Sequence, residues 1–102
     1  MSARMSKESK SVEIENERYE GEFLHDMFHG QGTFYFANGD VYVGQWVENK
    51  RSGKGIMYFE DGDRYEGEFL NDKFNGKGVY YFKTGVKRAG TWRNDKLVQQ
   101  SN

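Results

Sequence analysis

The sequence repeats itself at a fixed interval of 23 residues, and this periodicity constrains the fold more than any other feature. Tyr19–Phe23 reads YEGEF, Tyr42–Trp46 reads YVGQW, and Tyr65–Phe69 reads YEGEF again. A fourth copy, Arg88–Trp92, keeps the glycine and the final ring but begins with arginine instead of tyrosine. Such a period is typical of an array in which each unit buries its apolar surface against its neighbours.

Each copy continues with a GxG triplet, an aromatic segment and a turn signal. The triplets begin at Gly30, Gly53 and Gly76, and the segments TFYF, IMYF and VYYF follow them. The segments alternate with period two and are rich in Tyr, Phe, Val and Trp, which predicts β-strands and no helix. The turn signals are Asn38-Gly39, Asp61-Gly62 and Thr84-Gly85. Asn-Gly and Asp-Gly favour a two-residue type I′ hairpin.

This hairpin would set the register between neighbouring strands. With Asn38 and Gly39 as the loop, Tyr35 would face Tyr42, and residues directly opposite share one face of a sheet. Mid-strand glycines such as Gly44 would leave space for a ring to lie flat across the strand. One face is therefore expected to form an aromatic groove lined by Tyr35, Tyr42, Trp46, Tyr58, Tyr65, Phe69, Tyr81 and Trp92.

The periodicity also divides the chain. Residues 1–11 are polar and rich in Ser and Lys, so we expect a disordered tail. The array is expected over 12–97, followed by a second tail over 98–102. Within the array we expect a degenerate leading strand at 12–18, complete repeats at 19–41, 42–64 and 65–87, and a partial capping repeat at 88–97.

Composition narrows the class of protein. The chain of 102 residues has 15 basic and 16 acidic residues, a balance that argues against a nucleic-acid binder. No apolar run approaches the ~20 residues of a membrane span. Cysteine is absent, which excludes disulfides and thiolate metal sites. We expect a cytoplasmic location.

Candidate catalytic and metal-binding groups are weak. His25 and His29 have the spacing HxxxH, but they fall in an expected loop, and the next two copies have other residues at both positions. Glu20 and Glu22 alternate on a strand and are expected to be solvated. The GKG triplets lack the following Ser or Thr and the helix of a phosphate loop. We expect no catalytic residue, no metal and no cofactor, and hence no enzyme.

The pattern YxGxW/F, GxG, aromatic strand and D/N-G turn resembles the MORN (membrane occupation and recognition nexus) repeat over about 12–97. The resemblance implies an all-β protein, an elongated single-layer antiparallel sheet of tandem 23-residue β-hairpin repeats with a groove along one face. It also implies a scaffold that links cytoskeletal, ciliary or cell-division structures to partners or membranes. Members hold helical or peptide partners in the groove and are proposed to bind phosphoinositides.

Two binding hypotheses remain open. In the first, the aromatic groove captures an apolar helix or extended peptide of a protein partner, in a cytoskeletal or ciliary adaptor. In the second, basic residues of two inter-strand loops contact an anionic, phosphoinositide-containing membrane surface. These residues are Lys50, Arg51, Lys54, Lys73 and Lys77. Separately, the open edges of the sheet could support a homodimer.

Overall fold

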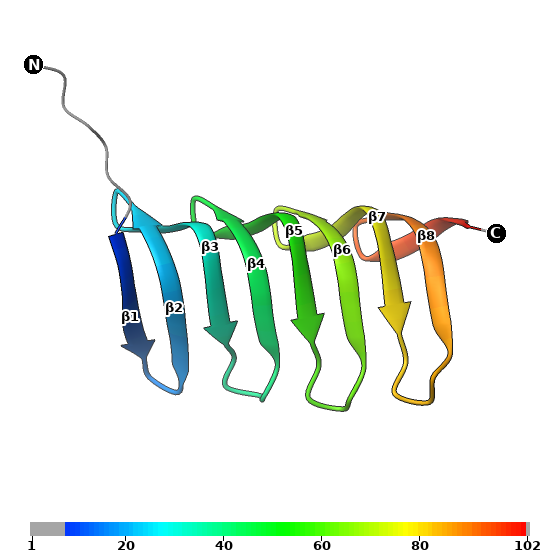
Figure 1. Cartoon of the computed structure of the whole chain (residues 1–102), viewed down its shortest axis with the longest axis horizontal. Helices are drawn as coiled ribbons and strands as arrows, with labels where there is room; N and C mark the ends of the chain where they lie inside the picture. Colours follow the sequence, from blue (N-terminus) through cyan, green and yellow to red (C-terminus); the bar gives the residue numbers. More distant parts are fainter. Residues whose placement is uncertain (1–7, 102) are drawn as a thin grey trace, which may run out of the picture.

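The computed structural model describes residues 8–101, which form one sheet of nine antiparallel strands in chain order (Figure 1). The molecule is elongated, with extents of 53 × 31 × 17 Å. The expected all-β, single-layer repeat architecture is thus confirmed. The strands are β1 (Glu8–Ile14), β2 (Glu17–Leu24), β3 (Met27–Tyr35), β4 (Val41–Val47), β5 (Lys50–Tyr58), β6 (Arg64–Leu70), β7 (Lys73–Tyr81), β8 (Lys87–Arg93) and β9 (Lys96–Gln100).

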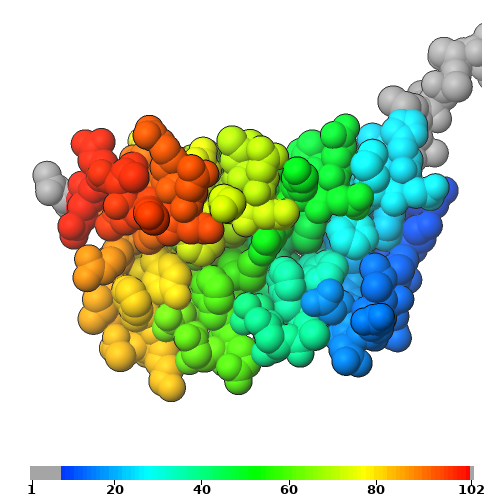
Figure 2. Space-filling model, turned by 180° about the vertical axis from the view of Figure 1, so that it is seen from behind, coloured from blue at the N-terminus to red at the C-terminus, as the bar shows by residue number. Residues whose placement is uncertain are grey.

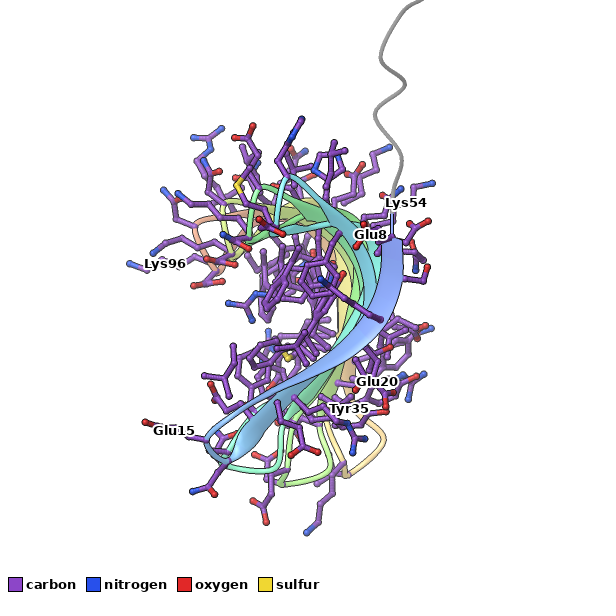
Figure 3. The ribbon with its side chains drawn as sticks, turned by 90° about the vertical axis from the view of Figure 1, so that its left-hand side faces the viewer. Glu8, Glu15, Glu20, Tyr35, Lys54 and Lys96 are labelled. Carbon is purple, nitrogen blue, oxygen red and sulfur yellow. The ribbon has the colours of Figure 1, made fainter. Side chains whose placement is uncertain are left out.

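The strands bend midway, so the sheet has a C-shaped cross-section with a concave and a convex face (Figure 3). The pairing register shifts near the mid-strand glycine of β4, between Gly44 and Trp46, and at the corresponding points of β2 and β6. The first glycine of each GxG triplet adopts a left-handed conformation there, as Gly53 does with φ 101°. Glycine is favoured in this region because it has no Cβ. These irregularities curve the strands around the rings on the concave face.

The hairpins at the Asn-Gly positions differ from the prediction. Of Asn38 and Gly39, only Gly39 has a positive φ. The Gly39 N–H donates to the Phe36 carbonyl at 3.0 Å, and the Phe36 N–H donates to the Asp40 carbonyl at 2.9 Å. The result is a three-residue loop ending in a left-handed glycine, not a two-residue type I′ turn.

The longer loop moves the register by one residue. Phe34 lies opposite Tyr42, and Tyr35 lies opposite Val41. A one-residue shift places each side chain on the other face of the sheet. The prediction that Tyr35, Tyr58 and Tyr81 share a face with Tyr42 was therefore wrong. They lie on the convex face, where Figure 3 shows Tyr35.

Two-residue turns occur instead at the opposite ends of the strands, where long loops were expected. Glu48 and Asn49 both have positive φ, as do the residue pairs at the three equivalent turns. These tight turns allow the GxG segments to pair as parts of β3, β5 and β7. The basic residues assigned to inter-strand loops are consequently strand residues, a correction that covers Lys50, Arg51, Lys54, Lys73 and Lys77.

Both ends of the array extend further than expected. β1 begins at Glu8 and pairs with β2, so residues 8–11 are strand and not a disordered tail. Residues 1–7 lie outside the described residues. At the other end, β9 continues to Gln100, which pairs with Gly90, so the strand extends into the expected tail at 98–102. The edge strands β1 and β9 pair with their neighbours through the backbone. The polar composition of these two segments did not indicate that they form strands.

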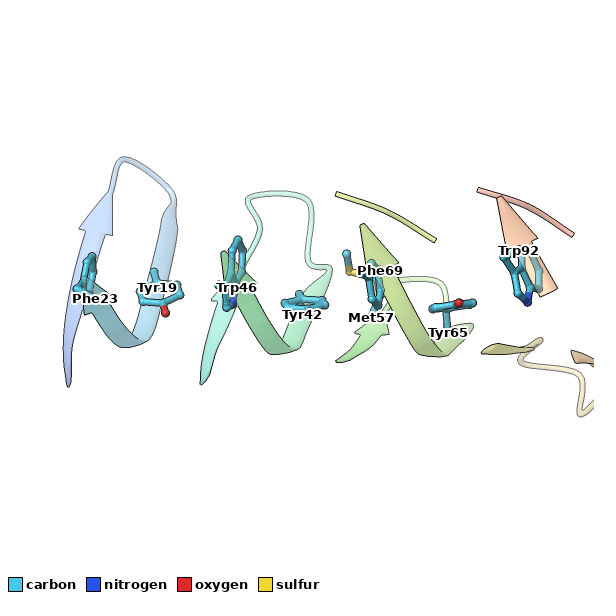
Figure 4. Packing of buried hydrophobic residues seen from close by; sticks show 8 residues of the cluster. All are labelled: Tyr19, Phe23, Tyr42, Trp46, Met57, Tyr65, Phe69 and Trp92. Carbon is cyan, nitrogen blue, oxygen red and sulfur yellow. The ribbon is translucent and has the colours of Figure 1, made fainter. Parts of the chain in front are cut away.

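The core is a line of rings on the concave face (Figure 4). The Tyr42 ring lies over Gly44 and Gly55, and a Cβ on Gly55 would lie 2.6 Å from Tyr42 Cε1. The Tyr42 hydroxyl donates to the Gln45 carbonyl at 2.8 Å, and the Trp46 ring stands at 87° to the Tyr42 ring. The expectation that glycine makes space for a flat ring is confirmed. The buried residues are Tyr19, Phe23, Tyr42, Trp46, Met57, Tyr65, Phe69 and Trp92.

Candidate protein-binding furrow

A furrow runs along the concave face, between the two rows of turns (Figure 2). It is lined by rings that pack on the core or on one another and keep part of their surface exposed. Phe34 and Phe36, for example, have ring centroids 4.7 Å apart and are both half-buried. Exposed aromatic surface of this kind is available to a partner. The lining rings are Phe28, Phe34, Phe36, Phe59, Phe74, Tyr80 and Phe82.

The residues predicted to line the groove have other positions. Five of them are on the concave face but form its buried floor, with exposures of 0% for Tyr42 and Tyr65 and 3–7% for the others. The remaining three lie on the convex face. The predicted eight therefore do not form one exposed lining. The buried set is Tyr42, Trp46, Tyr65, Phe69 and Trp92, and the convex set is Tyr35, Tyr58 and Tyr81.

Sequence reasoning missed the lining rings because it placed Phe34 and its equivalents on the opposite face. A signal was nevertheless present. An Asn-Gly pair also fits a three-residue loop whose last residue is a left-handed glycine. That alternative would have turned Phe34, Phe36 and Phe59 toward the core.

A charged residue lies among the rings of the furrow. In the hairpins on each side, Phe28 stacks on Tyr19 with centroids 3.9 Å apart, and Phe74 stacks on Tyr65 at 3.8 Å. Arg51 occupies the equivalent position in the central hairpin. Its side chain is 19% exposed, and its Nε lies 3.1 Å from Asp72 Oδ1.

A small cavity of about 190 Å³ lies beside this guanidinium. Arg51 and Asp72 form its charged side, and the Phe36 ring centroid lies 5.4 Å from Arg51 Cζ. The cavity therefore offers a hydrogen-bonding group within an apolar surface. Its other lining residues are Phe28, Phe34, Trp46 and Asn49.

The turns that border the furrow are anchored to the preceding repeat. Asn49 Oδ1 accepts the Phe28 N–H at 2.8 Å, and Asp72 Oδ1 accepts the Arg51 N–H at 2.9 Å. On the other border, Asp40 Oδ1 accepts the Glu60 N–H at 2.8 Å. Each bond joins residues 20 or 21 positions apart. The spacing of the rings along the furrow is thereby held before any partner binds, which lowers the entropic cost of binding.

The tyrosine hydroxyls on this face are hydrogen-bond donors. Burial, with a contribution from Glu22, raises the pKa of Tyr19 to about 12, and burial likewise raises the pKa of Tyr65 to about 12. Burial and the carboxylate of Asp63 raise the pKa of Tyr80 well above its usual value, and its hydroxyl donates to Asp63 Oδ2 at 2.8 Å. These groups are neutral at physiological pH and serve packing and hydrogen bonding.

The polar residues considered as catalytic candidates have structural contacts. Glu22 Oε1 accepts the Gln31 N–H at 2.6 Å, and the Lys54 N–H donates to Gln45 Oε1 at 2.7 Å. The GxG triplets are thus backbone irregularities capped by side chains. His25 lies in a turn, and His29 lies in β3 and not in a loop. Within residues 8–101, no group of three or more His, Asp or Glu side chains is arranged to hold a metal ion.

The basic residues considered for lipid contact lie on both faces of the sheet. Lys50 and Lys73 pair with Val47 and Leu70, and register places them on the convex face. Lys54 and Lys77 also lie on the convex face, where Figure 3 shows Lys54. Arg51 is on the concave face, opposite Trp46. In the described part of the chain, no helix is long and apolar enough to cross a membrane.

Comparison with known proteins agrees with this geometry. A family model described as the MORN repeat matches residues 19–41, 42–64 and 65–87. No curated protein matches the chain. The matched family is generally a non-catalytic binding module, and no enzyme family was detected. With the match extending over most of the nine-stranded sheet, the chain belongs to the MORN repeat family.

Proposed function

We propose that this protein is a non-enzymatic adaptor that captures an apolar helix or extended peptide of a protein partner in the concave furrow, in a cytoskeletal or ciliary setting. The supporting observation is two groups of half-exposed rings, separated by Arg51, on a curved, hydrogen-bonded scaffold. Aromatic side chains bury a large contact area at a low entropic cost, and they are enriched among residues that dominate binding energy.

The shape of the furrow favours an elongated partner. It follows the long dimension of a molecule that extends 53 Å, enough for several helical turns of about 5.4 Å each. A helix with one apolar face can lie in such a groove, with its polar face in solvent. An extended peptide would place alternate side chains against the same rings.

Adjacent residues provide a matched test. Phe59 lies in the furrow, whereas its neighbour Tyr58 points from the convex face. A photo-crosslinking side chain is introduced at position 59 or 58, and proteins are captured from cell extract. The crosslinked segment within each captured protein is then identified. That segment is then synthesised and titrated against the intact chain.

The expected result is crosslinking from position 59 and not from position 58. Phe59→Glu should weaken binding of the synthesised segment by at least about tenfold, and Tyr58→Glu should leave it unchanged. Equal capture from both positions, or a segment that binds Phe59→Glu normally, would contradict capture in the furrow.

A second candidate function is contact with an anionic membrane through the convex face. Val47 and Leu70 are 46% and 52% exposed, and each pairs with a lysine, Lys50 or Lys73. Exposed apolar groups beside lysines suit the surface of an anionic bilayer, and each basic residue contributes about 1 kcal/mol at low salt.

Vesicle sedimentation tests this second function. Vesicles with phosphoinositide should retain the chain at low salt, less so at high salt, and not after Lys50→Glu and Lys73→Glu. Equal recovery in the supernatant with and without phosphoinositide would exclude it. Binding in the furrow should tolerate high salt, which separates the two functions.

A further inference from the structure

The convex face of β4 differs from the same face of β2 and β6, which occupy equivalent positions in the array. On β2, Arg18 and Glu20 form an ion pair with a 3.3 Å separation. On β6, Arg64 and Glu66 form the same pair at 3.0 Å. The residues at these positions on β4 are Val41 and Val43.

Cross-strand pairing extends the apolar surface from β4 onto β5. Val41 lies opposite Tyr58, and Val43 lies opposite Ile56. We name these four residues the outer patch. Tyr58 is 44% exposed and Val43 is 36% exposed. Because β2 and β6 fold with an ion pair at the positions of the valines, the fold itself does not require valine there. Exposed apolar surface with a polar border is typical of an interaction site.

A hollow of about 520 Å³ adjoins the outer patch. Val43 and Ile56 contribute its apolar floor, together with glycine backbone, which has no side chain to fill the space. Its walls include Lys54, Glu68 and Lys77. Figure 3 shows Lys54 projecting from the convex side, away from the furrow.

The walls of the hollow carry available positive charge. Lys54 and Lys77 take part in none of the ion pairs found among residues 8–101. Glu68 lies on the strand between them, opposite Lys54, and its Oε1 accepts the Lys77 N–H at 2.6 Å. Two ammonium groups therefore share one carboxylate in the lining of the hollow, which leaves a net positive charge. An acidic group near the two ammonium groups would therefore be favoured, and a basic group would be disfavoured.

We propose that the outer patch binds an extended peptide of a second protein, with an apolar side chain over Val43 and Ile56 and a carboxylate beside the Lys54 or Lys77 ammonium group. A convex surface cannot enclose a helix as the furrow can, whereas a hollow of this volume accommodates one or two side chains. This site is independent of the furrow. The protein could thus hold one partner on each face of the same sheet.

The neighbouring strands supply the test variant. The double substitution Val41→Arg and Val43→Glu copies the sequence that β2 and β6 already carry on this face, so it should fold normally. A random peptide library is panned on the intact chain, with counter-selection on this double variant. Recovered peptides are synthesised and titrated against the intact chain, the double variant, Lys54→Glu with Lys77→Glu, and Phe59→Glu.

The proposal expects recovered peptides to combine an apolar residue with a nearby acidic residue. Their affinity should fall by at least about tenfold in both double variants and stay unchanged in Phe59→Glu. Thermal melting of the Val41→Arg and Val43→Glu variant should match that of the parent, which excludes unfolding as the cause.

Several results would overturn the proposal. One such result is that no recovered peptide binds the intact chain more tightly than the Val41→Arg and Val43→Glu variant. Another is that the enriched peptides lack acidic residues. Self-association of the chain that is lost in the double variant would identify a second copy as the occupant. Retention on anionic vesicles that requires Val41 and Val43 would identify a membrane instead. Loss of binding in Phe59→Glu alone would place the recovered peptides in the furrow.

Discussion

The central hairpin β4–β5 and its neighbours, β2–β3 and β6–β7, have the same scaffold but present different surfaces. All three place a tyrosine ring over a glycine pair and donate its hydroxyl to a backbone carbonyl three residues later. The central hairpin then has Arg51 where the others have a stacked phenylalanine, and Val41 and Val43 where the others have an ion pair.

This difference separates two kinds of position. Where a ring meets a glycine backbone, the close contact leaves no room for another side chain. The three hairpins therefore have the same residues at these positions. Where a side chain faces the furrow, the scaffold folds with either an aromatic ring or a cation. Where it faces solvent on the convex face, the scaffold folds with either a valine or a carboxylate. The surfaces of a repeat array can therefore differ from unit to unit at little cost in stability.

The largest effect is expected from Gly55→Val, which acts on the shared scaffold. The new Cβ would overlap the Tyr42 ring, which is fully buried and held by its hydroxyl bond to the Gln45 carbonyl. We expect a loss of about 3 kcal/mol in the free energy of unfolding, measured by urea denaturation. Lys54→Val, at the adjacent exposed position, is the control and should change it by less than about 0.5 kcal/mol. A small effect of Gly55→Val would show that the ring and glycine contact is not what the hairpins have in common.

High pH should weaken the scaffold through the same tyrosines. Burial raises the pKa of Tyr19 and Tyr65 to about 12 in the folded protein, whereas a tyrosine in the unfolded chain titrates near 10. The folded state therefore binds these protons more tightly. The contribution of this difference to the free energy of unfolding is fully present below a pH of about 10. It is lost as the pH rises through about 12.

Denaturation at a series of alkaline pH values, with tyrosinate absorbance as a second readout, tests this dependence. Tyr19→Phe and Tyr65→Phe should each reduce the alkaline loss of stability. An identical loss in the parent and in both variants would show that other groups cause it.

Arg51→Phe would convert the central hairpin into the type found on either side. The new ring should stack on Tyr42 as Phe28 stacks on Tyr19, and the exchange removes the ion pair between the partly buried Arg51 side chain and the more exposed Asp72. Stacked rings contribute about 0.5–1.5 kcal/mol, and such ion pairs contribute about 0–1 kcal/mol. We expect a gain of about 1 kcal/mol in the free energy of unfolding, whereas Arg51→Ala should reduce it. Destabilisation by phenylalanine would show that the central hairpin has its own packing requirement.

The smallest effect concerns the three Gly-ending loops. Asn38 and Asp61 accept a backbone N–H two residues later at 2.9 Å and 3.0 Å, but Thr84 does so only at 3.5 Å. Thr84→Asn should shorten this bond and raise the free energy of unfolding by a few tenths of a kcal/mol up to about 1 kcal/mol. Hydrogen exchange of the Val86 amide provides a local measure, and unchanged protection there would argue against a looser third loop.

Much of the fold could be predicted from the sequence because it depends on short-range patterns. The interval between Tyr19, Tyr42 and Tyr65, the alternation of strand residues and the glycine beside each ring all indicated stacked hairpins. The lining of the furrow could not be predicted as reliably. The face on which Phe34 or Tyr35 lies depends on whether the loop has two or three residues, and Asn38-Gly39 is compatible with both.

The repeat, the β-class and the fit of ring against glycine were determined by the sequence alone, since each is a property of one unit and its immediate neighbours. Tertiary structure decided the type of each turn and, through it, the face of each ring. The turn at Glu48-Asn49 places two non-glycine residues in the left-handed region, which is unfavourable locally. The Phe28 N–H, 21 residues earlier, donates a hydrogen bond to Asn49 Oδ1 that offsets that cost. Since this partner belongs to the preceding repeat, the preference for the turn arises only when the repeats have assembled.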